Sequence, residues 1–282
     1  MQKLNPELDT TLALSGEVKA DFGMRRGKTV ITNHYETPPL KVSRLMYPEI
    51  KEHAIAYLVE TSGGMVAGDQ YRYTLRLDKS AALTLIPQSS LKIYPQKNGE
   101  GAVQFYDVQL ADDTFLKLSP DTIIPFAASR FQNEQRITMN GNASLIWGEI
   151  LSAGRREREE IYDYERIDST FSVRVEGKLL IYDSLVLEPQ TRFVHEQGMM
   201  DGNDYYAVLW AVSPYLKETT SESWMEQWEA ADSVRKGVTK PEPNIVHARI
   251  LSNDLIELKK AYSQLEEKVE TWIREKRSAE KR

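Results

Sequence analysis

The fold of this chain is decided by the stretch TSGGMVAGDQYRYTLRLDKSAALTLIPQSSLKIY, which occupies residues 61–94. Three glycines, Gly63, Gly64 and Gly68, stand close together at its start. Glycine is used where the backbone adopts positive φ or passes close to another segment. These glycines and the carboxylate that follows them, Asp69, predict a tight loop that presents Asp69 at the start of a strand.

A regular alternation of apolar and polar residues follows this loop. It extends over residues 70–77 and is the period-2 pattern of a half-buried strand. Residues 78–80 predict a turn, and residues 82–86 predict a second strand that ends at Pro87. The pattern is compatible with a functional loop at the mouth of this strand pair and with a mobile hairpin that has a capped turn.

Short predicted strands separated by turn signals continue along most of the chain. They occupy residues 12–21, 28–35, 54–60, 103–110, 114–118, 131–139, 143–150, 171–175, 179–187, 205–212 and 245–251. Asn-Gly-Asn at residues 140–142 and Gly-Lys at residues 177–178 predict hairpin turns. No fixed repeat period links the strands, which disfavours a regular repeat solenoid. The sequence therefore predicts a mainly β protein, as a sandwich, a barrel or an irregular solenoid.

Two helices are predicted near the C-terminus, at about residues 221–236 and 252–277. The second helix has apolar residues at heptad spacing, and these residues are Leu255, Leu258, Tyr262, Leu265, Val269 and Trp272. This seam is narrower than the apolar stripe of most core helices. Two interpretations stay open: the helix lies on its own sheet, or the seam binds a helix of a partner protein.

The composition excludes several classes of function. The chain has 282 residues, which suits one β-rich domain over residues 1–282, and its formal net charge of −6 gives no indication of nucleic-acid binding. It has no cysteine, which excludes disulfides and thiolate ligands and is compatible with a reducing cytosol. No signal-peptide pattern and no membrane-spanning apolar run is present, so we expect a soluble cytoplasmic protein that contacts no membrane.

The common catalytic motifs are missing as well. There is no Gly-x-Ser-x-Gly elbow, and the four histidines do not stand in a catalytic or zinc-binding frame. The glycine loop lacks the Lys-Ser/Thr pair of a phosphate-binding loop, and it leads into a strand where such a loop leads into a helix. The remaining candidates for chemistry are four carboxylates on or beside apolar strands, namely Asp69, Glu149, Glu159 and Asp183.

These carboxylates are informative because a buried carboxylate is costly unless it is paired, hydrogen-bonded or metal-bound. Arg155 is the expected partner of Glu149, since a guanidinium can hold a carboxylate through two hydrogen bonds. Oxygen ligands with an occasional imidazole would hold a divalent metal ion loosely and release it. Three alternatives stay open: a transient metal path, a scaffold with structural carboxylates, and a β-solenoid enzyme that uses carboxylates as acid and base on an acidic polysaccharide.

Several motifs, in order along the chain, resemble the urease accessory protein D family (UreD, also called UreH). The matching pieces are SGGMVAGD at residues 62–69, LKIY at 91–94, IPF at 124–126 and ASLIWGEILSAGR at 143–155. The resemblance is good over about residues 17–187, and one departure is Ala67, where the family often has glycine. It implies a fold of stacked, helically wound strands with a few helices. The residues that match the family's motifs are Gly63, Gly64, Gly68, Asp69, Lys92, Tyr94, Glu149, Gly154, Arg155 and Glu159.

The resemblance also implies a function. Such a protein assembles with UreF and the GTPase UreG on apo-urease subunits, helps to install the nickel centre, and is not itself an enzyme. We expect transient nickel with no tightly bound cofactor, a nickel path through Asp69, Glu149, Glu159 and Asp183, and structural roles for the other motif residues. We also expect a dimeric or higher hetero-complex in which UreF binds the C-terminal helix.

Overall fold

The computed structural model describes residues 15–47, 53–96, 99–191 and 194–280. Residues 12–14 of the first predicted strand lie outside these ranges. In chain order, the strands are β1 (Ser15–Arg25), β2 (Lys28–Thr37), β3 (Leu40–Val42), β4 (His53–Glu60), β5 (Gln70–Leu77), β6 (Ala82–Pro87), β7 (Leu91–Ile93), β8 (Ala102–Leu110), β9 (Phe115–Leu118), β10 (Thr122–Pro125), β11 (Arg130–Met139), β12 (Ser144–Ser152), β13 (Arg166–Val175), β14 (Lys178–Leu187), β15 (Tyr205–Val212), β16 (Val234–Thr239) and β17 (Ile245–Ser252). The helices are the 3-10 turns η1 (Arg156–Arg158) and η2 (Pro214–Leu216) and the α-helices α1 (Ser221–Gln227) and α2 (Leu255–Glu280).

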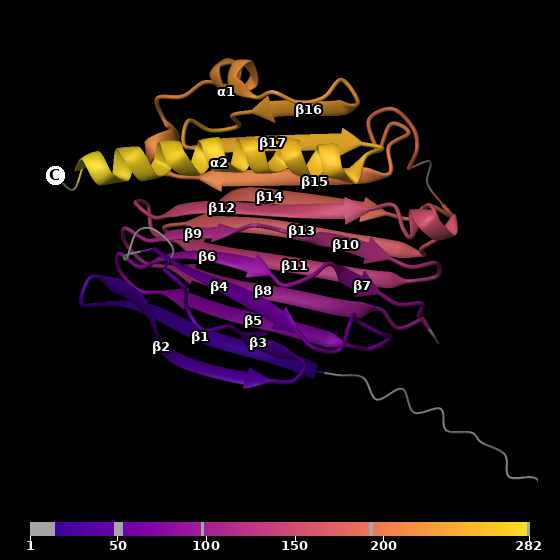
Figure 1. Cartoon of the computed structure of the whole chain (residues 1–282), viewed down its shortest axis with the longest axis horizontal. Coiled ribbons are helices and arrows are strands. Elements are labelled where there is room, and N and C mark those ends of the chain that lie inside the picture. The colour runs from indigo at the N-terminus through magenta and orange to yellow at the C-terminus, as the bar shows by residue number, and fades with distance from the viewer. Residues whose placement is uncertain (1–14, 48–52, 97–98, 192–193, 281–282) are drawn as a thin grey trace, which may run out of the picture.

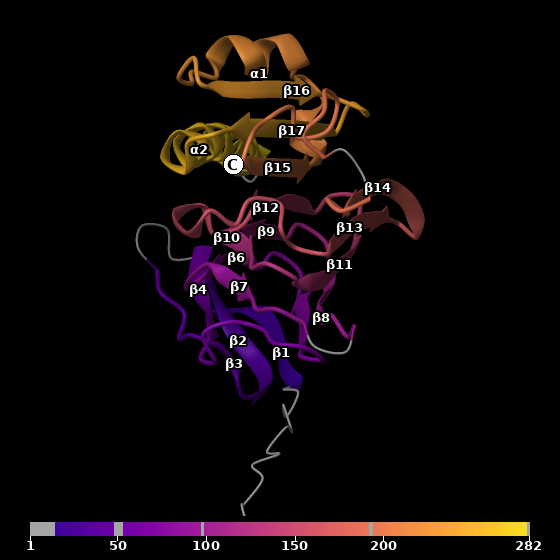
Figure 2. The same ribbon diagram turned by 90° about the vertical axis from the view of Figure 1, so that its right-hand side faces the viewer.

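The strands form two large sheets that are stacked on each other, and α2 covers the outer face of one of them (Figure 1, Figure 2). The first sheet has seven strands in the order β14-β13-β11-β8-β5-β1-β2. The second sheet follows the path β16-β17-β15-β12-β9-β6-β4-β3, with β10 beside β12 and β7 beside β10. The prediction of a mainly β protein with stacked, wound strands and two helices near the C-terminus is confirmed.

Parallel pairing shows that the middle of the chain winds as a coil between the two sheets. In the first sheet β5, β8, β11 and β13 are parallel neighbours, and in the second sheet β4, β6, β9 and β12 are parallel neighbours. The first-sheet strands of successive coils begin at Gln70, Ala102, Arg130 and Arg166, so the spacing between coils is unequal. This unequal spacing explains why the sequence has no fixed repeat period.

Two of the predicted strand pairs are wrong. β5 and β6 follow each other in sequence, as do β11 and β12, but in both cases the turn carries the chain from the first sheet to the second. A hairpin and such a crossing both bury one face of each strand, so both give the same alternation of residues. The turn at Gly177 does make the predicted hairpin, because β13 and β14 pair antiparallel.

The first predicted helix is too long. α1 ends at Gln227, and the residues from Val234 to Thr239 form β16, which pairs with β17. Trp224 and Trp228 have helical spacing and are both buried, but Trp228 is already extended, and its indole N–H donates to the Ala261 carbonyl at 2.8 Å. The helix was predicted too long because the spacing of four residues between the two tryptophans is typical of a helix. The β-branched residues that follow, which favour a strand, were given too little weight.

The second predicted helix is α2, which begins directly after Asp254. Asp254 is its N-cap, because the Asp254 carboxylate accepts hydrogen bonds from the N–H groups of Ile256 and Glu257 at 2.8 and 3.1 Å. Its seam packs on the outer face of the second sheet, where Leu258 and Leu265 are fully buried. No helix among the described residues is long and apolar enough to cross a membrane. The structure thus has the helix on its own sheet, and partner binding by this seam stays a prediction that requires the helix to leave the sheet.

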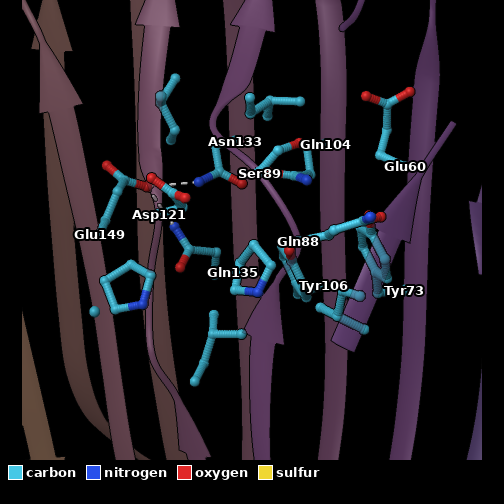
Figure 3. A pocket seen from close by; sticks show the side chains of 17 residues that line it. Glu60, Tyr73, Gln88, Ser89, Gln104, Tyr106, Asp121, Asn133, Gln135 and Glu149 are labelled. Carbon is cyan, nitrogen blue, oxygen red and sulfur yellow. Dashed lines mark hydrogen bonds between the residues drawn. The ribbon is translucent and has the colours of Figure 1, made fainter. Parts of the chain in front are cut away.

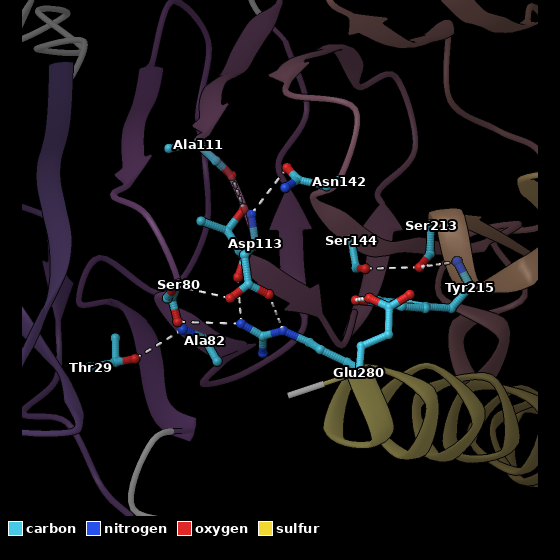
Figure 4. A network of polar contacts seen from close by, with 12 residues as sticks. Thr29, Ser80, Ala82, Ala111, Asp113, Asn142, Ser144, Ser213, Tyr215 and Glu280 are labelled. Carbon is cyan, nitrogen blue, oxygen red and sulfur yellow. Dashed lines mark hydrogen bonds and ion pairs between the residues drawn. The ribbon is translucent and has the colours of Figure 1, made fainter. Parts of the chain in front are cut away.

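Polar contacts fix the C-terminal end of α2 to the turns of the coil (Figure 4). Arg277 Nε donates to Asp113 Oδ1 at 2.9 Å, and the backbone N–H of Asp113 donates to Asn142 Oδ1 at 3.2 Å in the next turn. Tyr215 donates its hydroxyl proton to Glu280 at 2.9 Å. Two successive turns and the helix end are therefore joined in one network.

Candidate functional site

The glycine loop and the LKIY segment are in direct contact. The N–H of Met65 donates to the Lys92 carbonyl at 2.8 Å, and the N–H of Tyr94 donates to the Met65 carbonyl at 2.8 Å. Gly64 has a φ of +135°, and a Cβ at this position would lie 2.6 Å from the Lys92 oxygen. Only glycine fits here, so this part of the motif serves the packing of the loop on its neighbour.

Arg155 lies at the same end of the coil. Its guanidinium is 3.9 Å from the ring centroid of Phe126, and that ring packs edge-on against Tyr94 at 4.8 Å. Arg155 Nε donates to Glu160 Oε2 at 2.7 Å. The expected ion pair between Arg155 and Glu149 is therefore wrong: the guanidinium binds Glu160, which is close in sequence.

Two residues of the predicted nickel path, Asp69 and Glu159, lie away from the cavities of this site. Asp69 is buried and accepts the N–H of Val66 at 2.8 Å, which closes the glycine loop on itself. Glu159 is exposed at the end of η1, where it has a left-handed backbone with φ of 59°. Neither residue lines the two cavities described below.

Glu149 points into the space between the two sheets. It lies on β12, and only 7% of its surface is exposed. The neighbouring Gly148 faces α2, because a Cβ there would collide with the Tyr262 hydroxyl. Successive side chains on a strand point to opposite faces, so Glu149 faces inward.

Three hydrogen bonds converge on one oxygen of this carboxylate (Figure 3). Glu149 Oε2 accepts from Asn133 Nδ2 at 2.6 Å, from Gln135 Nε2 at 3.0 Å and from Ser169 Oγ at 2.8 Å. Trp147 orients one of these donors: its indole N–H can only donate, and it donates to Gln135 Oε1. The amide nitrogen of Gln135 is thereby directed at Glu149.

The donors belong to a row of polar residues across the first sheet that the sequence analysis missed. Gln104, Asn133 and Ser169 are in register on β8, β11 and β13, and Gln135 is two residues further along β11. The signal was available, because these residues occupy inward positions in strands whose other inward residues are apolar. An amide at such a position needs a buried partner.

Burial raises the pKa of Glu149. Hydrogen bonds from Ser169, Asn133 and Gln135 oppose this shift, and the negative charge of Asp183 adds to it. All three donors are neutral, so they leave the charge of an ionised Glu149 uncompensated. A carboxylate of this kind favours a cation that can reach it.

Two cavities meet at Glu149. The larger, of about 70 Å³, is lined by Glu60, Asp121 and Glu149, and Figure 3 shows Glu60 and Glu149 on opposite sides of it. The smaller, of about 20 Å³, is lined by Glu149, Ser169 and Asp183. A water molecule needs at least about 10–15 Å³, so the larger has room for a few waters and the smaller for one. Four carboxylates therefore line two adjoining cavities, and we call this series of side chains, Glu60, Asp121, Glu149 and Asp183, the path.

The smaller cavity also has aromatic residues and a histidine nearby. Asp183 Oδ1 accepts from Arg249 Nη2 at 2.9 Å, and its Oδ2 accepts from Trp210 Nε1 at 3.3 Å. His247 stacks on Trp210 with ring centroids 3.8 Å apart. Burial lowers the pKa of His247 to about 4, Arg249 adds to this and Asp183 opposes it. The imidazole is thus neutral, the form that can bind a metal ion.

The oxygen groups are spread along the path. In the part of the chain that the structure describes, no three His, Asp or Glu side chains are grouped closely enough to hold a metal ion.

Fold and site together define a coiled, two-sheet β protein in which buried polar residues line two adjoining cavities between the sheets. The family model described as UreD urease accessory protein matches residues 14–282, and the chain belongs to this family. Urease accessory protein UreD of Lysinibacillus sphaericus is 34% identical, over 90% of this chain and 95% of the relative. UreD of Sporosarcina pasteurii is 32% identical over 90% and 99%, and UreH of Helicobacter acinonychis is 27% identical over 80% and 83%. The resemblance seen in the sequence is confirmed.

Proposed function

We propose that this chain takes part in nickel insertion into apo-urease, in a complex with UreF and the GTPase UreG, and that it has no catalytic turnover of its own. Family membership and the names of the relatives support an accessory role in urease maturation. The observation that carries the nickel part of the proposal is Glu149, a buried carboxylate between two cavities with neutral donors alone around it.

Nickel is cargo in this proposal. Carboxylate and amide oxygens bind Ni²⁺ less tightly than thiolates do, and the chain has no cysteine. A cation beside Glu149 would compensate the charge that burial disfavours, and it could leave again because no cluster of metal ligands is found among the described residues. The cytoplasm is the compartment in which we place this activity, as one chain of a hetero-complex on the urease subunits.

The alternative function, a polysaccharide-processing enzyme, has little support. An acid and base pair on a sugar needs an open cleft with the two carboxyl groups on either side of the scissile bond. The four carboxylates of the path line cavities of about 70 and 20 Å³, and even the larger has room for only a few waters.

A reconstitution experiment tests the accessory role. Apo-urease is incubated with Ni²⁺, bicarbonate, GTP, UreF and UreG, with and without this chain, and urease activity is measured. We expect active urease only when the chain is present. Full activation in its absence would overturn the proposed function.

The substitution Glu149→Gln tests the path, with Glu266→Gln as the matched control. Both glutamates are 7% exposed, but Glu266 belongs to α2 and lies outside the two cavities. We expect Glu149→Gln to fold and join the complex, yet to lower the nickel content of the recovered urease severalfold, while Glu266→Gln delivers nickel normally. Equal nickel content with both variants would reject the path and leave a scaffold.

A further inference from the structure

Two carboxylates on the path each hold a cationic side chain, whereas Glu149 between the cavities holds none among the described residues. Asp121, in the larger cavity, is bound by the ammonium of Lys259 on α2 at 2.8 Å. Asp183, in the smaller cavity, is bound by the guanidinium of Arg249 on β17 at 2.9 Å. Both cations come from outside the coil.

Asp121 and Lys259 lie at the solvent-facing part of the larger cavity. Their side chains are 28% and 39% exposed, against 7% for Glu149. Asp121 Oδ1 also accepts from Ser90 Oγ at 3.0 Å and from the N–H of Thr122 at 2.6 Å. Burial opposes ionisation of Asp121, but the hydrogen bonds from Lys259 and Thr122 outweigh it and lower its pKa. At neutral pH Asp121 is thus an anion that the ammonium occupies.

A second observation points to a cation in the larger cavity. Asn133 is 3% exposed, and its amide nitrogen is committed to Glu149. Its Oδ1 lines this cavity and has no hydrogen-bond partner among the described residues. Figure 3 shows the oxygen on the side of the amide away from Glu149. An orphaned buried carbonyl oxygen is an acceptor for water or a ligand for a metal ion.

We propose that Lys259 and Arg249 are tethered cations that occupy two carboxylates of the path, Asp121 and Asp183, so that a metal ion binds at either carboxylate only by displacing the cation already there. This inference rests on the proposed nickel path. A metal ion on Asp121 Oδ1 would meet the ammonium at contact distance, and the repulsion between the two charges forces one to leave. The flexible lysine stem can swing into solvent, because the partly exposed pair is weak.

The tethered cations also make the path selective for charge. A monovalent ion gains the same Coulomb energy from Asp121 as the ammonium that it replaces, whereas a divalent ion gains twice as much. Lys259 therefore excludes K⁺ and Na⁺ more effectively than Ni²⁺. The carboxylate stays satisfied while no metal ion is present.

The substitution Lys259→Met tests the proposal by equilibrium dialysis of Ni²⁺ against the purified full chain. We expect about two- to fivefold tighter Ni²⁺ binding, the range for removal of a competing partner from a partly exposed ion pair. Lys259→Arg keeps the charge and should bind as the wild type does. The matched control is Lys260→Met, since Lys260 is the next residue on α2 and pairs with Glu257.

The gain must depend on Asp121. Asp121→Asn in the Lys259→Met background should return Ni²⁺ affinity to the wild-type level or below. At the other end Arg249→Met should likewise bind Ni²⁺ more tightly, with Arg235→Met on β16 as its control, because Arg235 pairs with Asp201 outside the cavities.

The results separate this proposal from the proposed function. If Lys259→Met binds Ni²⁺ no more tightly than Lys260→Met, or if the gain survives Asp121→Asn, the tethered-cation proposal is overturned, even when Glu149→Gln impairs nickel delivery. If Lys259→Met gains affinity through Asp121 while Glu149→Gln delivers nickel normally, Lys259 does block a nickel site, and the path through Glu149 is rejected.

Discussion

Each face of the second sheet buries a glutamate, and the negative charges of the two glutamates are balanced by different kinds of neighbour. On the inner face, Glu149 accepts hydrogen bonds from neutral amides and a hydroxyl. On the outer face, Glu266 of α2 accepts from Ser119 Oγ at 2.6 Å and lies 3.7 Å from the ammonium of Lys117. Lys117 also binds Glu270 at 2.6 Å. The two glutamates are therefore equally buried, but they differ in the charge of their partners: neutral donors at Glu149 and an ammonium near Glu266.

The pKa shifts express this difference. Burial raises the pKa of both carboxyl groups. At Glu266 the positive charge of Lys117 is the strongest opposing influence, whereas at Glu149 hydrogen bonds alone oppose the shift and Asp183 adds to it. A buried carboxylate does not by itself mark a functional site. Glu149 is distinguished by two further features: it lacks a cationic partner among the described residues, and it lines a cavity.

The largest effect should follow from removing the cation under α2. Lys117→Met leaves Glu266 without an ammonium and leaves Glu270 with Arg274 as its remaining partner, at 3.2 Å. Breaking a buried ion pair from one side costs roughly 3–5 kcal/mol, and we expect about 3 kcal/mol here because Arg274 remains. Urea unfolding followed by circular dichroism measures this loss.

The matched control is Lys259→Met, which breaks a partly exposed pair and should cost less than about 1 kcal/mol. An equal loss of unfolding free energy in both variants would show that the ion pairs of Lys117 contribute no more than the partly exposed pair of Lys259. The claim that the outer face of the sheet balances its buried glutamate with a cation would then fail.

A smaller effect is expected where the two faces share one strand. Gly148 and Glu149 are adjacent on β12, and a Cβ at Gly148 would meet Tyr262 of α2 at its hydroxyl and ring. Gly148→Ala should lower the free energy of unfolding by roughly 1–3 kcal/mol, the usual cost of overpacking. Adding Tyr262→Phe removes the closest contact and should recover part of the loss.

The same variant tests whether the two faces act independently. Nickel delivery by Gly148→Ala should match the wild type at a temperature where the variant is folded, because the added methyl group points away from the cavities. A strong loss of delivery from the folded variant would show that the position of α2 is coupled to the path.

Local patterns carried most of the fold and part of the site. The strand positions followed from alternation, and Glu149 was found because a carboxylate interrupts an otherwise apolar strand. The sequence could not distinguish a hairpin from a crossing between sheets, since both bury one face of each strand. It also could not assign partners: Lys117 and Glu270 are 153 residues apart, and Asn133 reaches Glu149 from the opposite sheet. Those contacts depend on how the coils stack, which no local pattern records.

The smallest effect on the free energy of unfolding should come from Glu149→Gln. The pH dependence of this effect shows whether Glu149 has a cationic partner. The glutamine keeps an oxygen for the three donors and removes the charge that burial disfavours. At neutral pH we therefore expect unchanged or slightly higher stability, by no more than about 1 kcal/mol, roughly the net contribution of one hydrogen bond. This contrasts with the loss expected for Lys117→Met.

The sign of the pH dependence follows from the raised pKa of Glu149. Below its ordinary value of 4.5 the carboxyl is protonated in both the folded and the unfolded state, so its ionisation contributes no difference between variant and wild type. As the pH rises from there to the pKa of the folded state, the unfolded chain gives up the proton first, and the wild type loses stability that the variant keeps. The advantage of Glu149→Gln should grow across this window and then level off. Thermal melts of the variant and the wild type from pH 4 to 8 measure this difference. A variant that is less stable than the wild type at neutral pH, with the deficit fading in acid, would mean that the ionised carboxylate has a cationic partner in solution and that Glu149 belongs with Glu266.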